Sequence, residues 1–167
     1  MPRLGMFRLG PRLRTLTAWP ERHPTLKRSG VSDQRKLELR TNQYVRIWKE
    51  TERSLVYMVR TAVLLPQSRE GLVEFYEDIV ASMSGIDRAS HDLLVDSREA
   101  TGRNDEVFEQ VQDRYRQALF GDFRRIAVVL RTLAGRLQVS RYQRSQTAVR
   151  SASFGTIEDA LEFLDAA

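Results

Sequence analysis

Apolar and polar residues alternate with two different periods along this chain, and these periods predict where strands and helices lie. Tyr44–Glu50 alternates apolar and polar side chains with a period of two, which is typical of a half-buried strand. A short polar turn leads to Leu55–Thr61, which is a second and more apolar strand. Two strands joined by so short a turn are expected to pair as an antiparallel hairpin.

Further segments repeat apolar residues with the i, i+3, i+4, i+7 spacing of a helix that buries one face. Four helices are predicted, and the third, over Leu133–Arg144, has the weakest pattern because it contains Gly135. The other three begin at residues whose side chains can cap a helix. These capping residues are Ser68, Asn104 and Thr156, and the glycines that end the first two helices are Gly85 and Gly121.

Short strands are predicted between these helices. Asp92–Asp96 and Arg125–Leu130 are nearly all apolar, as strands buried on both faces of a parallel sheet are, and Ala148–Phe154 is the last strand. The element order is then ββαβαβαβα. Because strand–helix–strand crossovers are right-handed, the strands from the second onward should lie parallel, with the first joined antiparallel through the hairpin. We therefore predict one α/β domain over residues 43–167 with a mostly parallel sheet.

Positive charge is concentrated in the first thirty residues. The chain of 167 residues has a formal net charge of +5, from 27 lysines and arginines against 22 acidic residues. Residues 1–30 hold seven of the basic residues and one acid, a balance of +6, so residues 31–167 have a balance of −1. The basic character therefore belongs to a leader, and the domain gives no overall reason to expect a nucleic-acid partner.

The leader is predicted to be disordered over residues 1–42, since four of the five prolines lie in it and interrupt any helix. Residues 1–30 also fit a start site assigned too far upstream. Val31 opens a polar segment typical of a protein start, and a GUG codon there would be the true initiator. The alternatives are an organellar transit peptide and a basic arm that contacts a membrane or nucleic acid.

Composition excludes several kinds of site. The absence of cysteine removes disulfides, thiolate metal sites and cysteine nucleophiles, and is compatible with a cytoplasmic location. His23 and His91 are the two histidines, and His91 is predicted to lie on the surface. No nucleophile elbow or phosphate-binding glycine loop is present, so we predict neither an enzyme nor a cofactor. No apolar run approaches the ~18 residues of a membrane span.

The element order, the strand LLVD ending in Asp96 and the final helix TIEDALEFL together resemble the STAS family. This family is named for sulfate transporters and anti-sigma factor antagonists, and belongs with CRAL-TRIO lipid-transfer domains to a wider group of small α/β domains. The resemblance covers about residues 42–166. It implies a bacterial regulatory domain that binds a protein partner without catalysis.

The family's regulators carry a serine, phosphorylated by a partner kinase, at the start of the helix that follows the third strand. Asn104 and Asp105 stand at that place in this chain, and neither can accept a phosphoryl group as serine does. The resemblance therefore implies a domain that lacks the phosphoacceptor. Either Asp105 supplies a fixed negative charge there, or this branch of the family does not use the switch.

The loop that follows Asp96 is the candidate partner-binding site, because open α/β sheets bind ligands at the carboxyl ends of parallel strands. A purely structural role, with Asn104 as a helix cap and Gly102 at positive φ, is the competing interpretation. The expected partner is an unidentified protein, and a small molecule or lipid held between the sheet and the first helix is the alternative. The candidate residues are Ser97, Arg98, Thr101, Arg103, Asn104, Asp105 and Glu106.

Two further features leave alternatives open. Between Arg124 and Arg150 the chain has seven arginines and no acid, which suits either an anionic partner or pairing with acidic residues of the helices. Trp48 in the hairpin is expected either in the core or exposed at an interface.

Overall fold

The computed structural model describes residues 36–133, 135, 139 and 150–166. All of them lie in the larger of the two units into which the chain divides, residues 31–167. Residues 1–35 of the predicted leader and most of the predicted helix Leu133–Arg144 lie outside the described residues.

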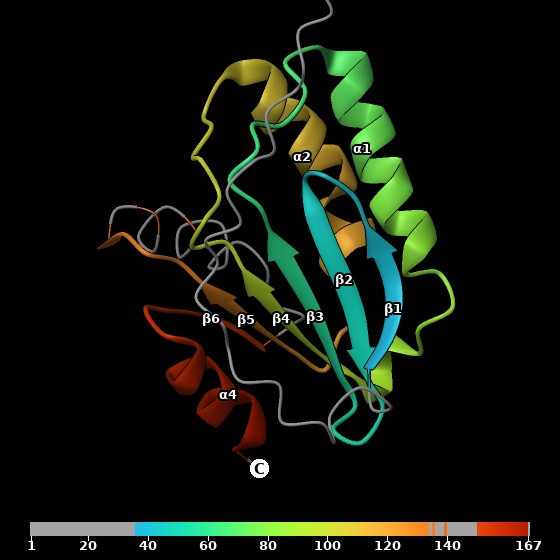
Figure 1. Cartoon of the computed structure of the whole chain (residues 1–167), viewed down its shortest axis with the longest axis vertical. Coiled ribbons are helices and arrows are strands. Elements are labelled where there is room, and N and C mark those ends of the chain that lie inside the picture. Colours follow the sequence, from blue (N-terminus) through green and yellow to red (C-terminus); the bar gives the residue numbers. More distant parts are fainter. Residues whose placement is uncertain (1–35, 134, 136–138, 140–149, 167) are drawn as a thin grey trace, which may run out of the picture. The chain divides into compact units, whose positions relative to one another are not determined.

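Six strands form one sheet in which each strand lies beside its neighbours in sequence (Figure 1). The second strand pairs antiparallel with both the first and the third, and the third to the sixth strands are parallel. The predicted fold class, an α/β domain with a mostly parallel sheet and an antiparallel hairpin at its start, is confirmed. The strands are β1 Lys36–Thr41, β2 Val45–Glu50, β3 Leu55–Arg60, β4 Asp92–Asp96, β5 Arg125–Val129 and β6 Arg150–Phe154.

Strand β1 lies inside the segment that the sequence analysis assigned to the leader, so the predicted element order needs a third strand before the first helix. Most of its side chains are exposed, and Leu39 is the one that packs against the core. Asn42 turns the chain into β2, since its Oδ1 accepts hydrogen bonds from the backbone of Tyr44 at 2.8 Å and Val45 at 3.0 Å. So polar an edge strand is recognisable only by its pairing with β2.

The helices cover the two faces of the sheet (Figure 1). Helices α1 (Arg69–Ser82) and α2 (Glu106–Phe120) pack together on one face, and α4 (Ile157–Asp165) covers the other face over β4 to β6. A 3-10 turn, Arg88–Ser90, precedes β4. None of the helices in the described part of the chain is long and apolar enough to cross a membrane.

The domain has a hydrophobic core on each face of the sheet, and strand β4 contributes side chains to both. All five residues of β4 are buried. Leu93 and Val95 belong to the core under α1 and α2, whereas Leu94 belongs to the core under α4. The prediction of a strand buried on both faces is therefore confirmed.

Helices α1, α2 and α4 each begin at a residue whose side chain caps the helix. The predicted caps Ser68 and Thr156 accept hydrogen bonds from the backbone three residues on, at 3.1 and 3.2 Å. The predicted cap Asn104 is wrong by one residue, because Asp105 accepts the bond from the Phe108 backbone at 3.0 Å. The positive φ predicted for Gly102 is also wrong.

Candidate functional site

Two loops meet at the carboxyl ends of β3 and β4. Residues 61–67 follow β3 and residues 97–105 follow β4, and Arg103 joins them. Its guanidinium donates hydrogen bonds to the carbonyl oxygen of Pro66 and, at 3.2 Å, to that of Gln67. Its side chain is only 13% exposed, so this arginine serves as a connection between the loops.

The same arginine also holds the residue that caps α2. Arg103 donates to both carboxylate oxygens of Asp105, from Nε to Oδ2 and from Nη2 to Oδ1 at 3.0 Å. These hydrogen bonds lower the pKa of Asp105 to about 2, and the bond from the Phe108 backbone contributes to the same shift. Asp105 is therefore an ionised cap whose charge is already paired.

A second carboxylate–arginine pair closes the end of β4. Asp96 is buried and accepts hydrogen bonds from Arg98, from Nε at 3.0 Å and from Nη2 at 2.8 Å. Burial raises the pKa of Asp96, but the hydrogen bonds from Arg98 outweigh this effect, so the pKa lies below its usual value. The Asp96 charge is thus neutralised at the base of the loop.

The predicted site residues lie along one stretch of this edge but have different surroundings. Thr101 reaches the other loop, with its Oγ1 3.5 Å from the carbonyl oxygen of Ala62. Asn104 is exposed, and Glu106 accepts a hydrogen bond from Gln110 at 2.8 Å. Ser97 is the member that lines a cavity inside the domain.

Two exposed apolar side chains stand next to these residues and were missed by the sequence analysis. Val63 is 44% exposed and Leu64 is 59% exposed, whereas Leu65 beside them is buried. The signal in the sequence is the short apolar run Ala62–Pro66. Which of its leucines faces solvent depends on the path of the loop.

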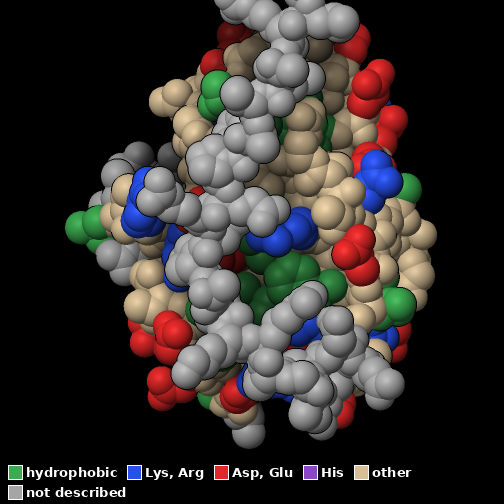
Figure 2. Space-filling model, in the orientation of Figure 1, with side chains coloured by type: hydrophobic (Ala, Val, Ile, Leu, Met, Phe, Trp, Pro, Cys, Tyr) green, Lys and Arg blue, Asp and Glu red, His purple; other side chains and the backbone are tan. Residues whose placement is uncertain are grey.

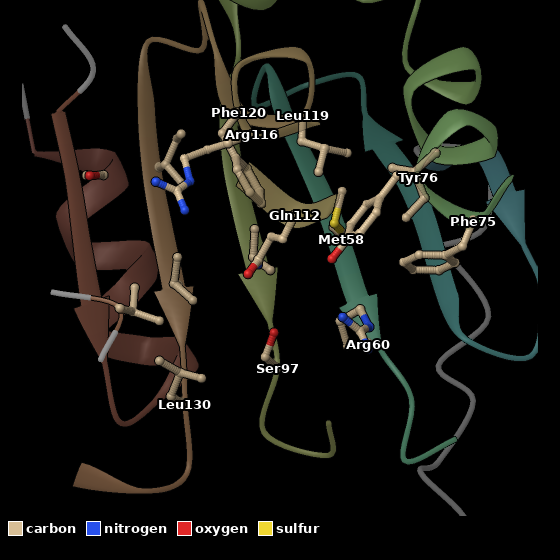
Figure 3. Close-up of a pocket in the computed structure, with 16 residues that line it drawn as sticks. Met58, Arg60, Phe75, Tyr76, Ser97, Gln112, Arg116, Leu119, Phe120 and Leu130 are labelled. Atoms are coloured by element: carbon tan, nitrogen blue, oxygen red, sulfur yellow. The ribbon is translucent and has the colours of Figure 1, made fainter. Parts of the chain in front are cut away.

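A cavity of about 190 Å3 lies between the sheet and helices α1 and α2 (Figure 3). Arg60, Tyr76 and Gln112 line it together with Ser97, and the figure shows their polar ends directed toward the same space. Most of the remaining wall is apolar. It includes Met58, Phe75, Ile79, Val95, Leu119, Phe120, Ile126, Val128 and Leu130.

Arg60 was also missed by the sequence analysis, although the pattern of β3 places it. Val56 and Met58 face the core under α1 and α2, and a period of two continues this face to Arg60. A cation at a position where the pattern requires an apolar residue is a signal of a site that could have been read from the sequence.

A separate charged cluster lies at the amino end of β4. Buried Asp92 accepts hydrogen bonds from Arg124, at 3.0 Å from Nε and 2.5 Å from Nη2, and lies 3.5 Å from Arg125 Nε. The prediction that His91 lies on the surface is wrong, because this side chain is 6% exposed and its Nδ1 is 2.6 Å from the carbonyl oxygen of Asp87. Nδ1 also lies 2.9 Å from Ser90 Oγ, so the imidazole is held by residues of the 3-10 turn and its N-cap.

The basic run pairs within the sheet at its start. Arg124 and Arg125 contact Asp92 of β4, whereas the predicted partners were acidic residues of the helices. Arg150 lies over the Phe163 ring at 5.3 Å. The acidic side chains of α1 and α4 lie on the surface, as Figure 2 shows. Arg136, Arg141 and Arg144 lie outside the described residues.

Trp48 lies on the sheet face opposite α1 and α2. It is partly buried and stacks on Tyr57 of β3, with ring centroids 5.0 Å apart and an angle of 8° between the rings. Its position is thus between the two predicted alternatives, the core and an exposed interface.

In the described part of the chain, no group of three or more histidine, aspartate or glutamate side chains is arranged to hold a metal ion.

The pairing of Arg103 with Asp105 makes stability depend on pH in a definite window. Because the pKa of Asp105 is lowered on folding, its contribution is present above the ordinary value of about 4 and is lost as the pH falls toward 2. The substitution Asp105→Asn retains a capping side chain but loses the charge. We therefore expect this variant to have a lower free energy of unfolding than wild type at pH 7, and the two values to converge as the pH falls through this window. Urea unfolding at a series of pH values measures the difference.

The control for this experiment is the same substitution in an Arg103→Gln background. The difference in free energy of unfolding between Arg103→Gln and the double variant Arg103→Gln/Asp105→Asn should change far less with pH. The reason is that the double variant and its parent both lack the cation that lowers the pKa of Asp105. An unchanged pH dependence in that background contradicts the assignment of the effect to Arg103.

Comparison with known proteins shows a similarity in fold. No protein-family model matches the chain, and no curated protein matches it in sequence. Its structure is similar to that of an uncharacterized protein of the DUF3478 family from Shewanella loihica PV-4, described as having a SpoIIAA-like fold. The SpoIIAA-like fold named for that protein is STAS-like.

The match covers 77% of this chain and 91% of the other, with a TM-score of 0.49 and 14% sequence identity. At this level the similarity concerns the arrangement of strands and helices. It assigns no ligand, partner or reaction to this chain.

Proposed function

We propose that this chain is a bacterial, cytoplasmic protein-binding domain of STAS type that acts without catalysis. The observation that carries the proposal is the loop pair at the carboxyl ends of β3 and β4. There Arg103 holds two loops together, and Val63 and Leu64 project into solvent from the loop that follows β3. Apolar side chains held in place and rimmed by polar ones are typical of a protein interface.

The contact surface in this proposal consists of Val63, Leu64 and the seven residues predicted from the sequence. Their charges are mostly paired inside the domain, since Arg98 binds Asp96 and Arg103 binds Asp105. A partner can therefore bury the apolar side chains of this surface. The free-energy cost of desolvating unpaired charges is then small. The partner is expected to present an apolar patch to the two loops.

In this proposal, partner binding does not require phosphorylation at the start of α2. Asn104 and Asp105 occupy that place, and the Asp105 carboxylate is held by Arg103 and by the backbone of Phe108. A negative charge is thus always present there and always paired. This supports a constitutive binding surface in place of one that phosphorylation controls.

Site-specific photo-crosslinking in the producing cells tests the proposal. A photoreactive amino acid at Leu64 should give a discrete adduct with a cellular protein, and the adduct should weaken in an Arg103→Ala background, where the loops lose their connection. Leu37 on β1 is a matched control, because it is 56% exposed against 59% for Leu64 and lies on the edge of the sheet away from these loops. Equal adducts from both positions, or none from Leu64, would contradict the proposal.

A further inference from the structure

Arg60 is a cation without a counter-charge. It ends β3 on the face that packs against α1, and in the described part of the chain its guanidinium makes no hydrogen bond or ion pair. Its Nε is buried and has no hydrogen-bond partner. Its neighbour is the Phe75 ring, 5.6 Å from the guanidinium carbon. A buried donor left unpaired costs free energy, so such a group in a native fold calls for a partner.

The charge of Arg60 persists despite its surroundings. Burial lowers the pKa of Arg60, since desolvation disfavours the charged form, but an arginine remains protonated at neutral pH. The described residues that line the cavity include Arg116 as a second cation and no aspartate or glutamate. The cavity therefore favours a negatively charged ligand.

Three hydrogen-bonding side chains share the space with Arg60. Ser97 follows β4, Tyr76 comes from α1 and Gln112 from α2, and all three line the cavity (Figure 3). Burial raises the pKa of Tyr76 to about 12, so its hydroxyl keeps its proton at neutral pH and can donate it to an anion. The polar end of the cavity lies at the carboxyl ends of parallel strands, where open α/β sheets bind ligands.

The remaining lining residues indicate the size and polarity of the ligand. A cavity of about 190 Å3 lined by Phe75, Leu119 and Ile126 has room for a small apolar body. An engineered apolar cavity of about 150 Å3 is known to bind benzene, so the space suits a group of about one aromatic ring. A single free guanidinium at the polar end suits a single carboxylate.

The protein itself shows how its arginines hold carboxylates. Arg98 binds Asp96, and Arg124 binds Asp92, each through Nε to one oxygen and Nη2 to the other. Arg60 carries the same donor groups, and its side chain lines the cavity. We propose that this cavity binds a small monocarboxylic acid, with its carboxylate on Arg60 and its apolar body, about one ring in size, against Phe75, Leu119 and Ile126.

This site lies between the sheet and helices α1 and α2 and shares only Ser97 with the proposed partner surface, so either assignment can fail alone. The test is calorimetric titration of the full chain with benzoate and with hexanoate as the probes, and with benzamide as the neutral analogue of benzoate. We expect saturable binding of a carboxylate, with benzamide roughly 10- to 100-fold weaker because it lacks the charge that pairs with Arg60. Arg60→Met should weaken carboxylate binding by a similar factor.

Arg46→Met is the matched control, because Arg46 is an exposed arginine on the opposite face of the sheet and its loss should leave binding unchanged. Nuclear Overhauser contacts between the benzoate ring and the methyl groups of Leu119 and Ile126 locate the ligand in the wild-type chain, whatever the stability of the Arg60 variant. The proposal is overturned by equal binding of benzoate and benzamide, by ring contacts elsewhere, or by no saturation of either carboxylate at about 10 mM.

Discussion

Leu93→Ala is expected to lower the free energy of unfolding by about 3–4 kcal/mol, because it removes buried methyl groups and leaves a cavity that the neighbouring elements cannot close. Leu93 is fully buried in β4 and faces the core under α1 and α2. Leu94→Ala should have a similar cost on the other face, where the side chain packs in the core with Leu164 of α4. Urea denaturation followed by circular dichroism measures both losses.

Leu64→Ala is the control for this pair, because Leu64 is a leucine that is 59% exposed. Its replacement should change the free energy of unfolding by no more than about 0.5 kcal/mol. A loss below about 1 kcal/mol for either strand variant contradicts the burial of β4 on both faces.

Asp92→Asn is expected to destabilise the domain by about 3 kcal/mol, because it leaves a partly buried arginine without its carboxylate. Asp92 is 3% exposed, and the Arg125 side chain that faces it is 12% exposed. The Arg125 Nε is buried and makes no hydrogen bond, so the nearby charge of Asp92 is what compensates it. Chemical denaturation at neutral pH measures the loss.

The second variant in this experiment is Asp92→Asn combined with Arg125→Met, which should recover part of the loss because it removes the uncompensated cation as well. Asp113→Asn is the control. Asp113 is 71% exposed and pairs with Arg116 one turn along α2, so its replacement should cost less than about 1 kcal/mol. Equal losses for Asp92→Asn and Asp113→Asn would contradict the role assigned to the buried carboxylate.

Most of the fold was predictable because each of its main elements buries a regular pattern of apolar residues. The alternation in β2 and β3, the apolar run of β4 and the helical spacing from Leu72 to Ile79 each correspond to an element of the structure. Strand β1 was not predictable in this way. Its residues are mostly polar and exposed, and it is a strand only because β2 supplies its hydrogen-bond partners.

The candidate site was predictable in its position and less so in its chemistry. Element order alone places the loop after Asp96 at the carboxyl edge of the sheet, where the structure brings it beside the loop after β3. The sequence does not say that Arg103 spans residues 66 and 105, or that Asp105 caps α2 in place of Asn104. Those contacts join segments far apart in the chain or differ by one residue in a turn, and local pattern resolves neither.

The periodicity of apolar residues in the sequence is sufficient to predict an α/β arrangement whose β4 is buried on both faces. The sequence also located the candidate loop, through the rule that parallel strands present their carboxyl ends at one edge. Which charges are paired is seen only in the folded domain. Asp96, Asp105 and Asp92 each meet an arginine, whereas Arg60 meets an aromatic ring and an open cavity. Pairing depends on the distances between elements, and chain order alone does not set these distances.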